Sequence, residues 1–271
     1  MKKGKVVKGE LMCAGFRPGG INPICGASVW KAFGIPTMLY GCEVWSRSTM
    51  TEVKLLNQRN TLEAKRQEGL SQTTHSAGAL GTIGMRSISG HIDKLKLLFF
   101  RNLCRMSPLR LEKRLFIKRL FSLLADKDAS NLAFASDIVR IPRLNNWYQY
   151  LEDYLETCAF PSKNVWRNVV IDSITVHQTI SWKEETLQEP LLFHLRNKDH
   201  ELKPVIHWET AKRNPINRGI IANLVNLYCG NVLSPILDAV VKDESSYVCT
   251  ICKKRVTYIG YHFIIDCIGT N

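Results

Sequence analysis

The sequence is short of acidic residues. It has 24 aspartates and glutamates against 37 lysines and arginines, so its formal net charge is +13. An excess of positive charge favours polyanionic partners such as nucleic acid or an anionic membrane surface. A basic protein of this size can also have no polyanionic partner, so charge alone leaves both interpretations open.

Long apolar runs are also absent. No stretch of 18 uncharged apolar residues occurs, which argues against a transmembrane helix. The basic start, MKKGK, is not followed by the apolar block of a secretory signal peptide. We therefore expect a nuclear or cytoplasmic protein that is not secreted and has no membrane partner.

The residue patterns of the common catalytic centres are missing as well. The chain contains no Asp-Asp pair, no Gly-rich phosphate loop and no recognisable nucleophile–base set. We expect that this chain alone is not an enzyme and has no small-molecule substrate. Six isolated histidines are interpreted as surface or hydrogen-bonded core residues rather than catalysts. They are His75, His91, His177, His194, His200 and His207.

Nine cysteines occur, an odd number at mostly irregular spacings. A secreted disulfide framework is usually shorter and led by a signal peptide, so this pattern does not indicate one. Six of the nine are interpreted as reduced, partly buried small hydrophobic residues. They are Cys13, Cys25, Cys42, Cys104, Cys158 and Cys229.

The other three cysteines lie near the end of the chain together with a histidine. Cys249 and Cys252 form a Cys-x2-Cys pair, and His262 and Cys267 follow. Such a pair directs two thiolates at one ion, and a structural zinc site needs four ligands of this kind. The spacing therefore predicts a structural Zn site. The alternative is that the two cysteines are close in sequence by chance and bind no metal. A redox motif is not indicated, because no βαβ pattern surrounds the pair.

The identity of the fourth zinc ligand stays open. Residues five apart on an ideal helix are about 140° apart around its axis, so His262 and Cys267 cannot share one helical face. Cys267 can reach the ion only where the chain bends back, at Ile268 and Gly269. Asp266 lies four residues after His262 and is the rival fourth ligand.

Apolar residues recur at helical spacing through most of the chain, which predicts a mainly α fold. We expect helices over 28–40, 51–68, 91–106, 109–125, 143–156, 165–180 and 216–237. Four glycines mark 78–90 as a turn-rich connector, and the best linkers are 71–90 and 197–215. The expected organisation has four segments. They are an irregular N-terminal remnant (1–27), a helical thumb-like region (28–125), a helical linker region (126–244) and a zinc knuckle (245–271).

A stripe of nine basic residues runs along the predicted helices 91–106 and 109–125, interrupted by one acid, Glu112. Phosphates of a nucleic acid are natural partners for such a stripe. The alternative is a solvated helix face, although such faces usually mix both charges. The nine residues are Lys94, Lys96, Arg101, Arg105, Arg110, Lys113, Arg114, Lys118 and Arg119.

Several segments, taken in order, resemble the C-terminal part of non-LTR retrotransposon reverse transcriptases. The segment VWKAFGIPTMLYGCEV at 29–44 is similar to a helix of the family with the pattern W…Y-V-x-P-x-L-L-Y-G-x-E. The Cys-x2-Cys pair with His262 and Cys267 is similar to the family's terminal knuckle, C-P-x-C…E-H-F-L-x-x-C. The other similar segments are MCAGF at 12–16, GINP at 20–23, LNQR at 56–59, GL at 69–70 and SGHIDKL at 89–95. The match is loose over 120–215, and Ser71, Thr250 and Tyr261 depart from the family's pattern.

The resemblance implies a thumb, a linker and a zinc knuckle without the polymerase centre. That centre needs paired carboxylates for its metal ions, and the similar segments begin downstream of it. The family's endonuclease is absent too. We therefore expect a truncated, non-catalytic fragment that binds RNA or an RNA–DNA hybrid through the basic stripe. The alternative is a zinc-stapled protein-interaction module with no nucleic-acid role.

Overall fold

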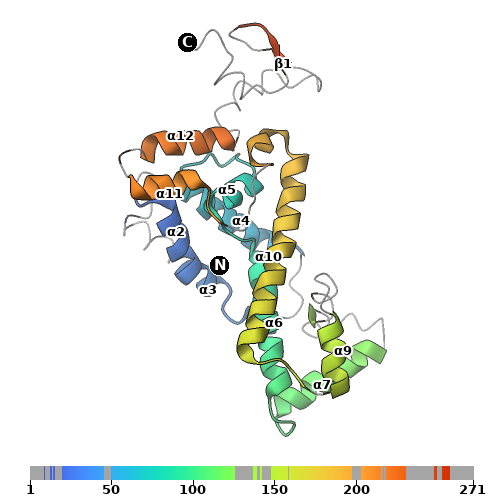
Figure 1. The fold of residues 1–271 in the computed structure, drawn as a ribbon. Coiled ribbons are helices and arrows are strands. Elements are labelled where there is room, and N and C mark those ends of the chain that lie inside the picture. The colour runs from blue at the N-terminus through green and yellow to red at the C-terminus, as the bar shows by residue number, and fades with distance from the viewer. Residues whose placement is uncertain are drawn as a thin grey trace. The chain divides into compact units, whose positions relative to one another are not determined.

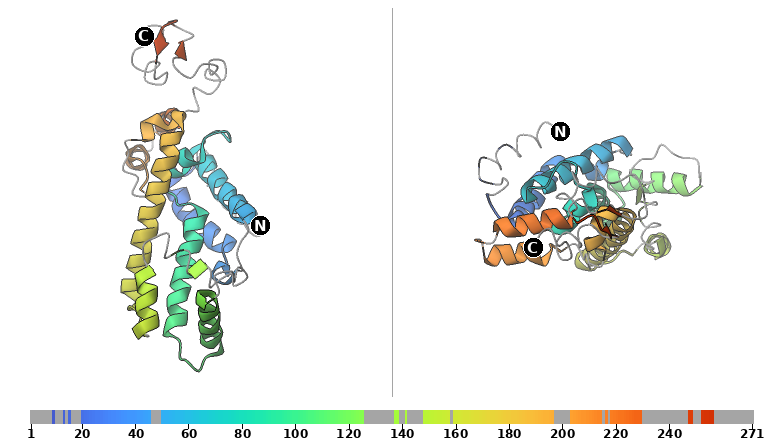
Figure 2. Two further views of the ribbon diagram at one scale, coloured as in Figure 1. Left: turned by 90° about the vertical axis from the view of Figure 1, so that its right-hand side faces the viewer. Right: turned by 90° about the horizontal axis from the view of Figure 1, so that it is seen from above.

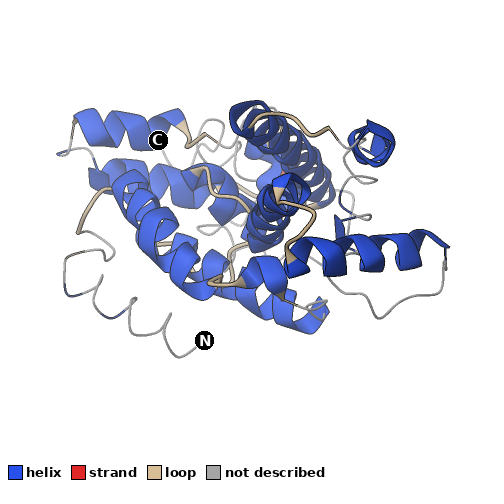
Figure 3. Ribbon diagram, turned by 90° about the horizontal axis from the view of Figure 1, so that it is seen from below, coloured by secondary structure: helices blue, strands red, loops and turns tan. Residues whose placement is uncertain are grey.

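Helices dominate the computed structural model, as the apolar periodicity predicts (Figure 3). The structure describes residues 20–45, 50–125, 148–157, 159–196, 203–214, 218–229, 247–248 and 252–256. It also describes the single positions 9, 13, 15, 137, 138, 141 and 216. Within these residues the expectation of a mainly α fold is confirmed.

The helices follow one another along the chain (Figure 1). The first group comprises α2 (Pro23–Val29), the π-helix η1 (Trp30–Gly34), α3 (Ile35–Met38), the 3₁₀ helix η2 (Cys42–Val44), α4 (Met50–Glu68), α5 (Ser76–Ile83), α6 (Ile88–Arg105) and α7 (Leu111–Ala125). The second comprises α9 (Tyr148–Thr157), α10 (Lys163–Gln188), the 3₁₀ helix η3 (Pro190–Leu195), α11 (Ile206–Arg213) and α12 (Arg218–Tyr228). Strands β1 (Tyr247–Val248) and β2 (Arg255–Val256) pair antiparallel.

The chain forms two compact units, and each unit takes several separate stretches of sequence. Unit 1 comprises 1–14, 28–61 and 86–182, and unit 2 comprises 15–27, 62–85 and 183–271. Three of the divisions fall within α2, α4 and α10, so these three helices contribute residues to both units. The four consecutive segments expected from the sequence stay a prediction.

The core of unit 1 is an aromatic cluster where α6, α7, α9 and the start of α10 meet. Phe100 of α6 is surrounded edge-on by four rings, whose centroids lie 5.2–6.3 Å from its own. The indole N–H of buried Trp166 donates to the Leu97 carbonyl at 2.9 Å. This bond joins α10 to α6, and the two helices run side by side (Figure 2). The four rings are Phe116, Tyr154, Phe160 and Trp166.

A polar chain in the same unit fixes the start of α6. Buried Trp30 donates its indole N–H to Asn60 at 3.0 Å, and Asn60 donates to the Arg86 carbonyl at 2.9 Å. Asn57 accepts the backbone N–H of Ile88 at 2.6 Å, which satisfies one of the free donors at the helix N-terminus. Gly34 lies so close to the Trp30 ring that a Cβ atom there would overlap it.

Unit 2 packs around Trp208 of α11. Its side chain is fully buried, and its indole N–H donates to the Glu68 carboxylate at 2.8 Å. Helix α12 lies alongside α11 (Figure 1). Gly78 of α5 permits close packing, because a Cβ atom there would meet the Leu192 side chain at 2.9 Å.

Two segments expected to be irregular are helical, so both expectations were wrong. Residues 76–83 form α5 within the expected connector, and Ile206–Arg213 form α11 within the expected linker. In α5, Gly78 and Gly81 are buried, so close packing offsets the poor intrinsic helix propensity of glycine. Gly84 then ends the helix with a left-handed conformation at φ +66°.

Candidate nucleic-acid interface

The nine basic residues of the predicted stripe lie on α6, on α7 and in the turn that joins them, all within unit 1. The turn is closed by a hydrogen bond from the Arg110 N–H to the Ser107 carbonyl at 3.0 Å. Helix α7 continues from it, because the Arg114 N–H donates to the Arg110 carbonyl at 3.1 Å. The nine side chains do not form one common surface.

Lys96 and Lys113 are buried, so the expectation that they contribute to an exposed cationic face needs correction. Lys96 is 2% exposed and forms an ion pair with Asp137. Lys113 is 8% exposed, and its ammonium donates to the Cys104 carbonyl at 2.6 Å and to the Tyr154 hydroxyl. Buried charges need such partners, so these two lysines belong to the interior.

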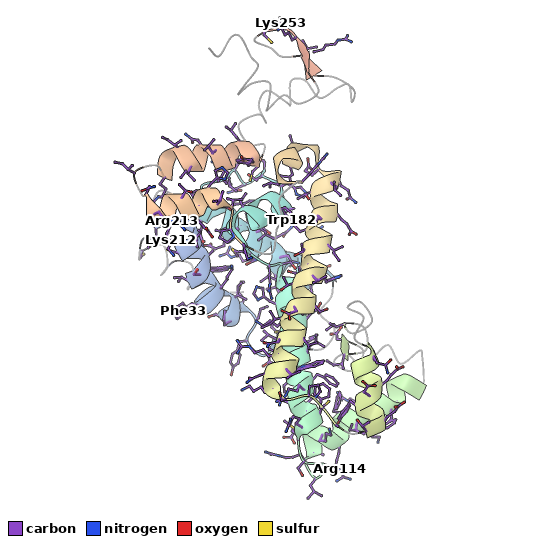
Figure 4. The ribbon with its side chains drawn as sticks, in the orientation of Figure 1. Phe33, Arg114, Trp182, Lys212, Arg213 and Lys253 are labelled. Carbon is purple, nitrogen blue, oxygen red and sulfur yellow. The ribbon has the colours of Figure 1, made fainter. Side chains whose placement is uncertain are left out.

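Five of the nine residues are exposed on the end of α6, in the turn after it and on α7. They are Arg105, Arg110, Arg114, Lys118 and Arg119, and we call them the α7 cationic surface. Arg110, Arg114 and Lys118 follow each other at four-residue steps, so they form a row on one side of the helix. Arg114 lies at the outer side of α7 (Figure 4). Such a row presents positive charge at a regular spacing.

The remaining two residues of the stripe, Lys94 and Arg101, are half-buried. Arg101 donates from Nε to the Pro161 carbonyl at 3.4 Å. Lys94 lies two turns from the start of α6, away from the exposed row along the helix. Neither belongs to the α7 cationic surface.

Large apolar side chains are exposed among these cations. Leu109 is 89% exposed, and Leu111, Leu115 and Phe121 are also exposed. A hollow of about 650 Å³ is lined by residues of α6, α7 and α9 and of the segments that follow α6 and α9, including Met106, Phe121 and Tyr154. Exposed apolar clusters often mark protein contacts. The α7 region therefore offers a second kind of surface next to the cationic one.

His91 of α6 is a basic group that the sequence pattern did not distinguish from the other isolated histidines. Its Nε2 atom is buried and has no hydrogen-bond partner among the described residues. Burial, together with the nearby charges of Arg86, Lys94 and Lys31, lowers the pKa of His91 to about 4. His91 is therefore neutral at pH 7 and lies in a cationic environment.

The lowered pKa of His91 predicts a pH-dependent stability. Between its ordinary pKa of 6.5 and about 4, the unfolded chain binds a proton at this histidine and the folded chain does not. The stability that neutral His91 contributes is therefore present above pH 6.5 and lost on acidification through this window. We expect the free energy of unfolding to fall by about 2 kcal/mol across this window. The fall is smaller than the pKa difference alone would give, because the partial exposure of His91 screens its charge. Urea unfolding of His91→Asn between pH 7 and 4 should show a flatter profile. The matched control is His177→Asn, at an exposed position on α10.

The predicted zinc site lies mostly outside the described residues. Cys249, His262, Asp266 and Cys267 are not among them, whereas Cys252 is described and half-buried. It lies at a turn between β1 and β2 and is followed by Lys253, which has a left-handed φ of +60°. No group of three or more metal-ligating side chains occurs within the described part of the chain. The site stays a prediction, and a hairpin turn at Cys252 suits a Cys-x2-Cys knuckle.

Within the described ranges, no helix is both long enough and apolar enough to cross a membrane. Comparisons with known protein families, with curated proteins and with solved structures found no match. The resemblance to reverse transcriptases therefore rests on the sequence segments alone.

Proposed function

We propose that this chain binds RNA or an RNA–DNA hybrid through the α7 cationic surface, as a non-catalytic relative of the C-terminal part of non-LTR retrotransposon reverse transcriptases. One observation carries the proposal. Five exposed cations, three of them in a row, lie on the end of α6, in the turn after it and on α7, and Glu112 is the one acid between Lys94 and Arg119. The choice of RNA or a hybrid comes from the resemblance.

The proposed binding is electrostatic. A phosphate that a lysine or arginine neutralises releases its condensed counterion, so affinity falls as salt rises. Contacts of this kind position a nucleic acid without reading its sequence. Arginine suits the role because its guanidinium can bind a phosphate through two hydrogen bonds. We therefore expect weak sequence preference and a strong salt dependence.

Replacing the row should weaken binding and reduce its salt dependence together. In Arg110→Gln/Arg114→Gln/Lys118→Gln, the slope of log affinity against log salt should fall by about one for each removed phosphate contact. Filter binding to single-stranded RNA and to an RNA–DNA hybrid, at several salt concentrations, measures both quantities. The matched control is Lys54→Gln/Lys212→Gln/Arg213→Gln, which removes three exposed charges elsewhere. An equal loss in both triple variants would mean that net charge, and not the row, drives binding.

We also propose a structural zinc ion held by Cys249 and Cys252 with His262 and Cys267. Support comes from the ligand spacing, from the resemblance and from the hairpin turn at Cys252. Lys253 and Lys254 are exposed beside the knuckle, where they offset the charge of the thiolates. The ion would hold the short C-terminal segment together, because structural zinc binding supplies folding free energy directly.

Metal analysis of the purified protein tests the zinc site. The wild-type chain should carry one zinc ion, and Cys249→Ser/Cys252→Ser should carry none. A matched control, Cys13→Ser/Cys25→Ser, removes two cysteines from outside the site and should keep the metal. Equal zinc in all three proteins would exclude the site. Comparing Cys267→Ser with Asp266→Asn identifies the fourth ligand.

A second candidate function is protein interaction without a nucleic-acid role, and the exposed Leu109, Leu111, Leu115 and Phe121 favour it. Charge reversal separates the two functions. In Arg105→Glu/Arg110→Glu/Arg114→Glu, which reverses three charges of the α7 cationic surface, nucleic-acid binding should collapse. An apolar protein contact should survive that change and fail instead in Leu111→Ser/Leu115→Ser.

A further inference from the structure

The hollow of about 650 Å³ in unit 1 is lined both by apolar side chains and by a buried cation. Lys113, Ile117 and Phe121 of α7 all line it. They follow each other at four-residue steps, so they form one row along the helix. From Lys113 to Phe121 the helix rises by about 12 Å, at 1.5 Å per residue. The row therefore has an ammonium at one end and an aromatic ring at the other.

The Lys113 ammonium is held in one place by two hydrogen bonds. It donates to the Cys104 carbonyl at 2.6 Å and to the Tyr154 hydroxyl, and it lies 4.9 Å from the centroid of the Tyr154 ring. These partners belong to α6 and α9, so three helices of unit 1 fix its position. A ligand that binds this ammonium would not have to order a flexible side chain, which is a usual cost of binding.

The contacts that the structure gives this ammonium are neutral. Both oxygens are uncharged, so they satisfy N–H donors and do not neutralise the positive charge. Burial raises the pKa of the Cys104 thiol to about 12, so this side chain is neutral at pH 7 as well. An ammonium has three N–H donors, and the Cys104 and Tyr154 oxygens occupy two of them. Because a buried charge is costly until an opposite charge pairs with it, an anion in the hollow would be favoured.

The rest of the wall is mainly apolar and aromatic. Ile117, Phe121 and Phe160 contribute to it, and the Phe160 ring packs edge-on against Tyr154 with 5.4 Å between centroids. Arg105 also lines the hollow and is exposed, so it adds a second cation. Pockets of about 300–1,000 Å³ with a mostly apolar wall and a few polar groups are typical of small-molecule sites.

We propose that this hollow, which we call the Lys113 hollow, binds a small carboxylate that has an apolar tail. The carboxylate would accept a charge-assisted hydrogen bond from the Lys113 ammonium. The tail would lie along Ile117 toward Phe121, where each buried methylene group adds affinity. The ligand is bound and not converted, so the site goes beyond the nucleic-acid interface. Of the α7 cationic surface, Arg105 alone lines the hollow.

Calorimetric titration of the full chain with decanoate and with decanol tests the role of the charge. The wild-type protein should bind decanoate at least about tenfold more tightly than decanol, because only the carboxylate pairs with Lys113. In Lys113→Met, which removes the charge, this preference should disappear while decanol still binds. The matched control is Lys54→Met, at an exposed position on α4, and it should keep the preference. No binding of decanoate by the wild type, or an unchanged preference in Lys113→Met, would overturn the proposal.

Two further comparisons test the apolar wall. Affinity should rise from octanoate to decanoate by up to about fourfold for each added methylene group. Phe121→Ala should weaken both decanoate and decanol binding several-fold. Leu115→Ala, at an exposed position on the same helix that does not line the hollow, should weaken neither. A decanoate affinity that depends neither on chain length nor on Phe121 would place the ligand elsewhere and overturn the proposal.

Lys113 also supports the fold, because its bond to the Cys104 carbonyl satisfies an acceptor in the last turn of α6. A role that is only structural would lower the melting temperature of Lys113→Met and leave the ratio of decanoate to decanol affinity unchanged. If Lys113→Met does not fold, Arg105→Gln replaces it. Its decanoate affinity should fall several-fold, whereas its decanol affinity should not. A wild-type ratio of the two affinities in Arg105→Gln would then overturn the proposal.

The ligand site and the nucleic-acid interface can fail independently. The Arg110→Gln/Arg114→Gln/Lys118→Gln protein should keep its decanoate affinity, because none of these three residues lines the hollow. Lys113→Met should keep its RNA affinity, because the Lys113 ammonium is buried and lies outside the α7 cationic surface. Titrating both proteins with decanoate and with RNA therefore shows which of the two sites exists.

Discussion

Asp137→Asn should destabilise the protein by about 3–5 kcal/mol, because it leaves the buried Lys96 ammonium without a counter-charge. Lys96 is 2% exposed, and its ion pair with Asp137 joins α6 to a position 41 residues later in the chain. Asparagine keeps the shape of the side chain and removes only its charge. Urea unfolding at pH 7 measures the loss of free energy.

Two further variants separate the ion pair from the packing. Lys96→Met/Asp137→Leu should be more stable than Asp137→Asn, since an apolar pair leaves no buried charge unpaired. Glu112→Gln removes an exposed acid from α7 and should change stability by less than about 0.5 kcal/mol. If Lys96 instead faces solvent and binds phosphate, Asp137→Asn will keep wild-type stability and bind nucleic acid more tightly.

Trp166→Ala should cost about 3–5 kcal/mol, as large-to-small changes of buried aromatic residues do. The indole is 1% exposed, its ring centroid lies 4.7 Å from that of Phe160, and it donates to the Leu97 carbonyl. The substitution therefore opens a cavity in the aromatic cluster and removes the bond between α10 and α6. Thermal and urea unfolding should both show the loss.

A neighbouring residue provides the control for Trp166. Val165 is exposed on the same helix, so Val165→Ala should change stability by less than about 0.5 kcal/mol. Trp166→Phe keeps an aromatic ring but no N–H donor. Its stability should lie between those of Trp166→Ala and Val165→Ala. Equal stability of the alanine variants at 165 and 166 would contradict the packing of this cluster.

The sequence predicted the helices whose apolar faces repeat regularly, such as α6 and α7. It missed α5 and α11, because their helical state depends on packing against residues far along the chain. Gly78 is tolerated in α5 since Leu192 and Cys229 fill the space beside it. Trp208 anchors α11 by its contact with Glu68, 140 residues earlier. A local pattern contains neither contact.

The candidate site shows the same limit. The sequence identified the basic residues of α6 and α7, but a count of charges could not show that Lys96 and Lys113 are buried. That outcome depends on Asp137 and Tyr154, each 41 residues away.

The interleaved units have a consequence for synthesis of the protein. Unit 1 needs residues up to position 182, and unit 2 needs its N-terminal stretch 15–27 together with the segment that begins at 183. At a translation rate of roughly 5–20 residues per second, the ribosome reaches position 182 only after on the order of ten to forty seconds. The stretches 15–27 and 62–85 remain without their packing partners for longer still, because those partners begin at residue 183. The nascent chain therefore holds apolar segments of both units exposed at once, and it is in this interval that we expect the protein to depend most on chaperones.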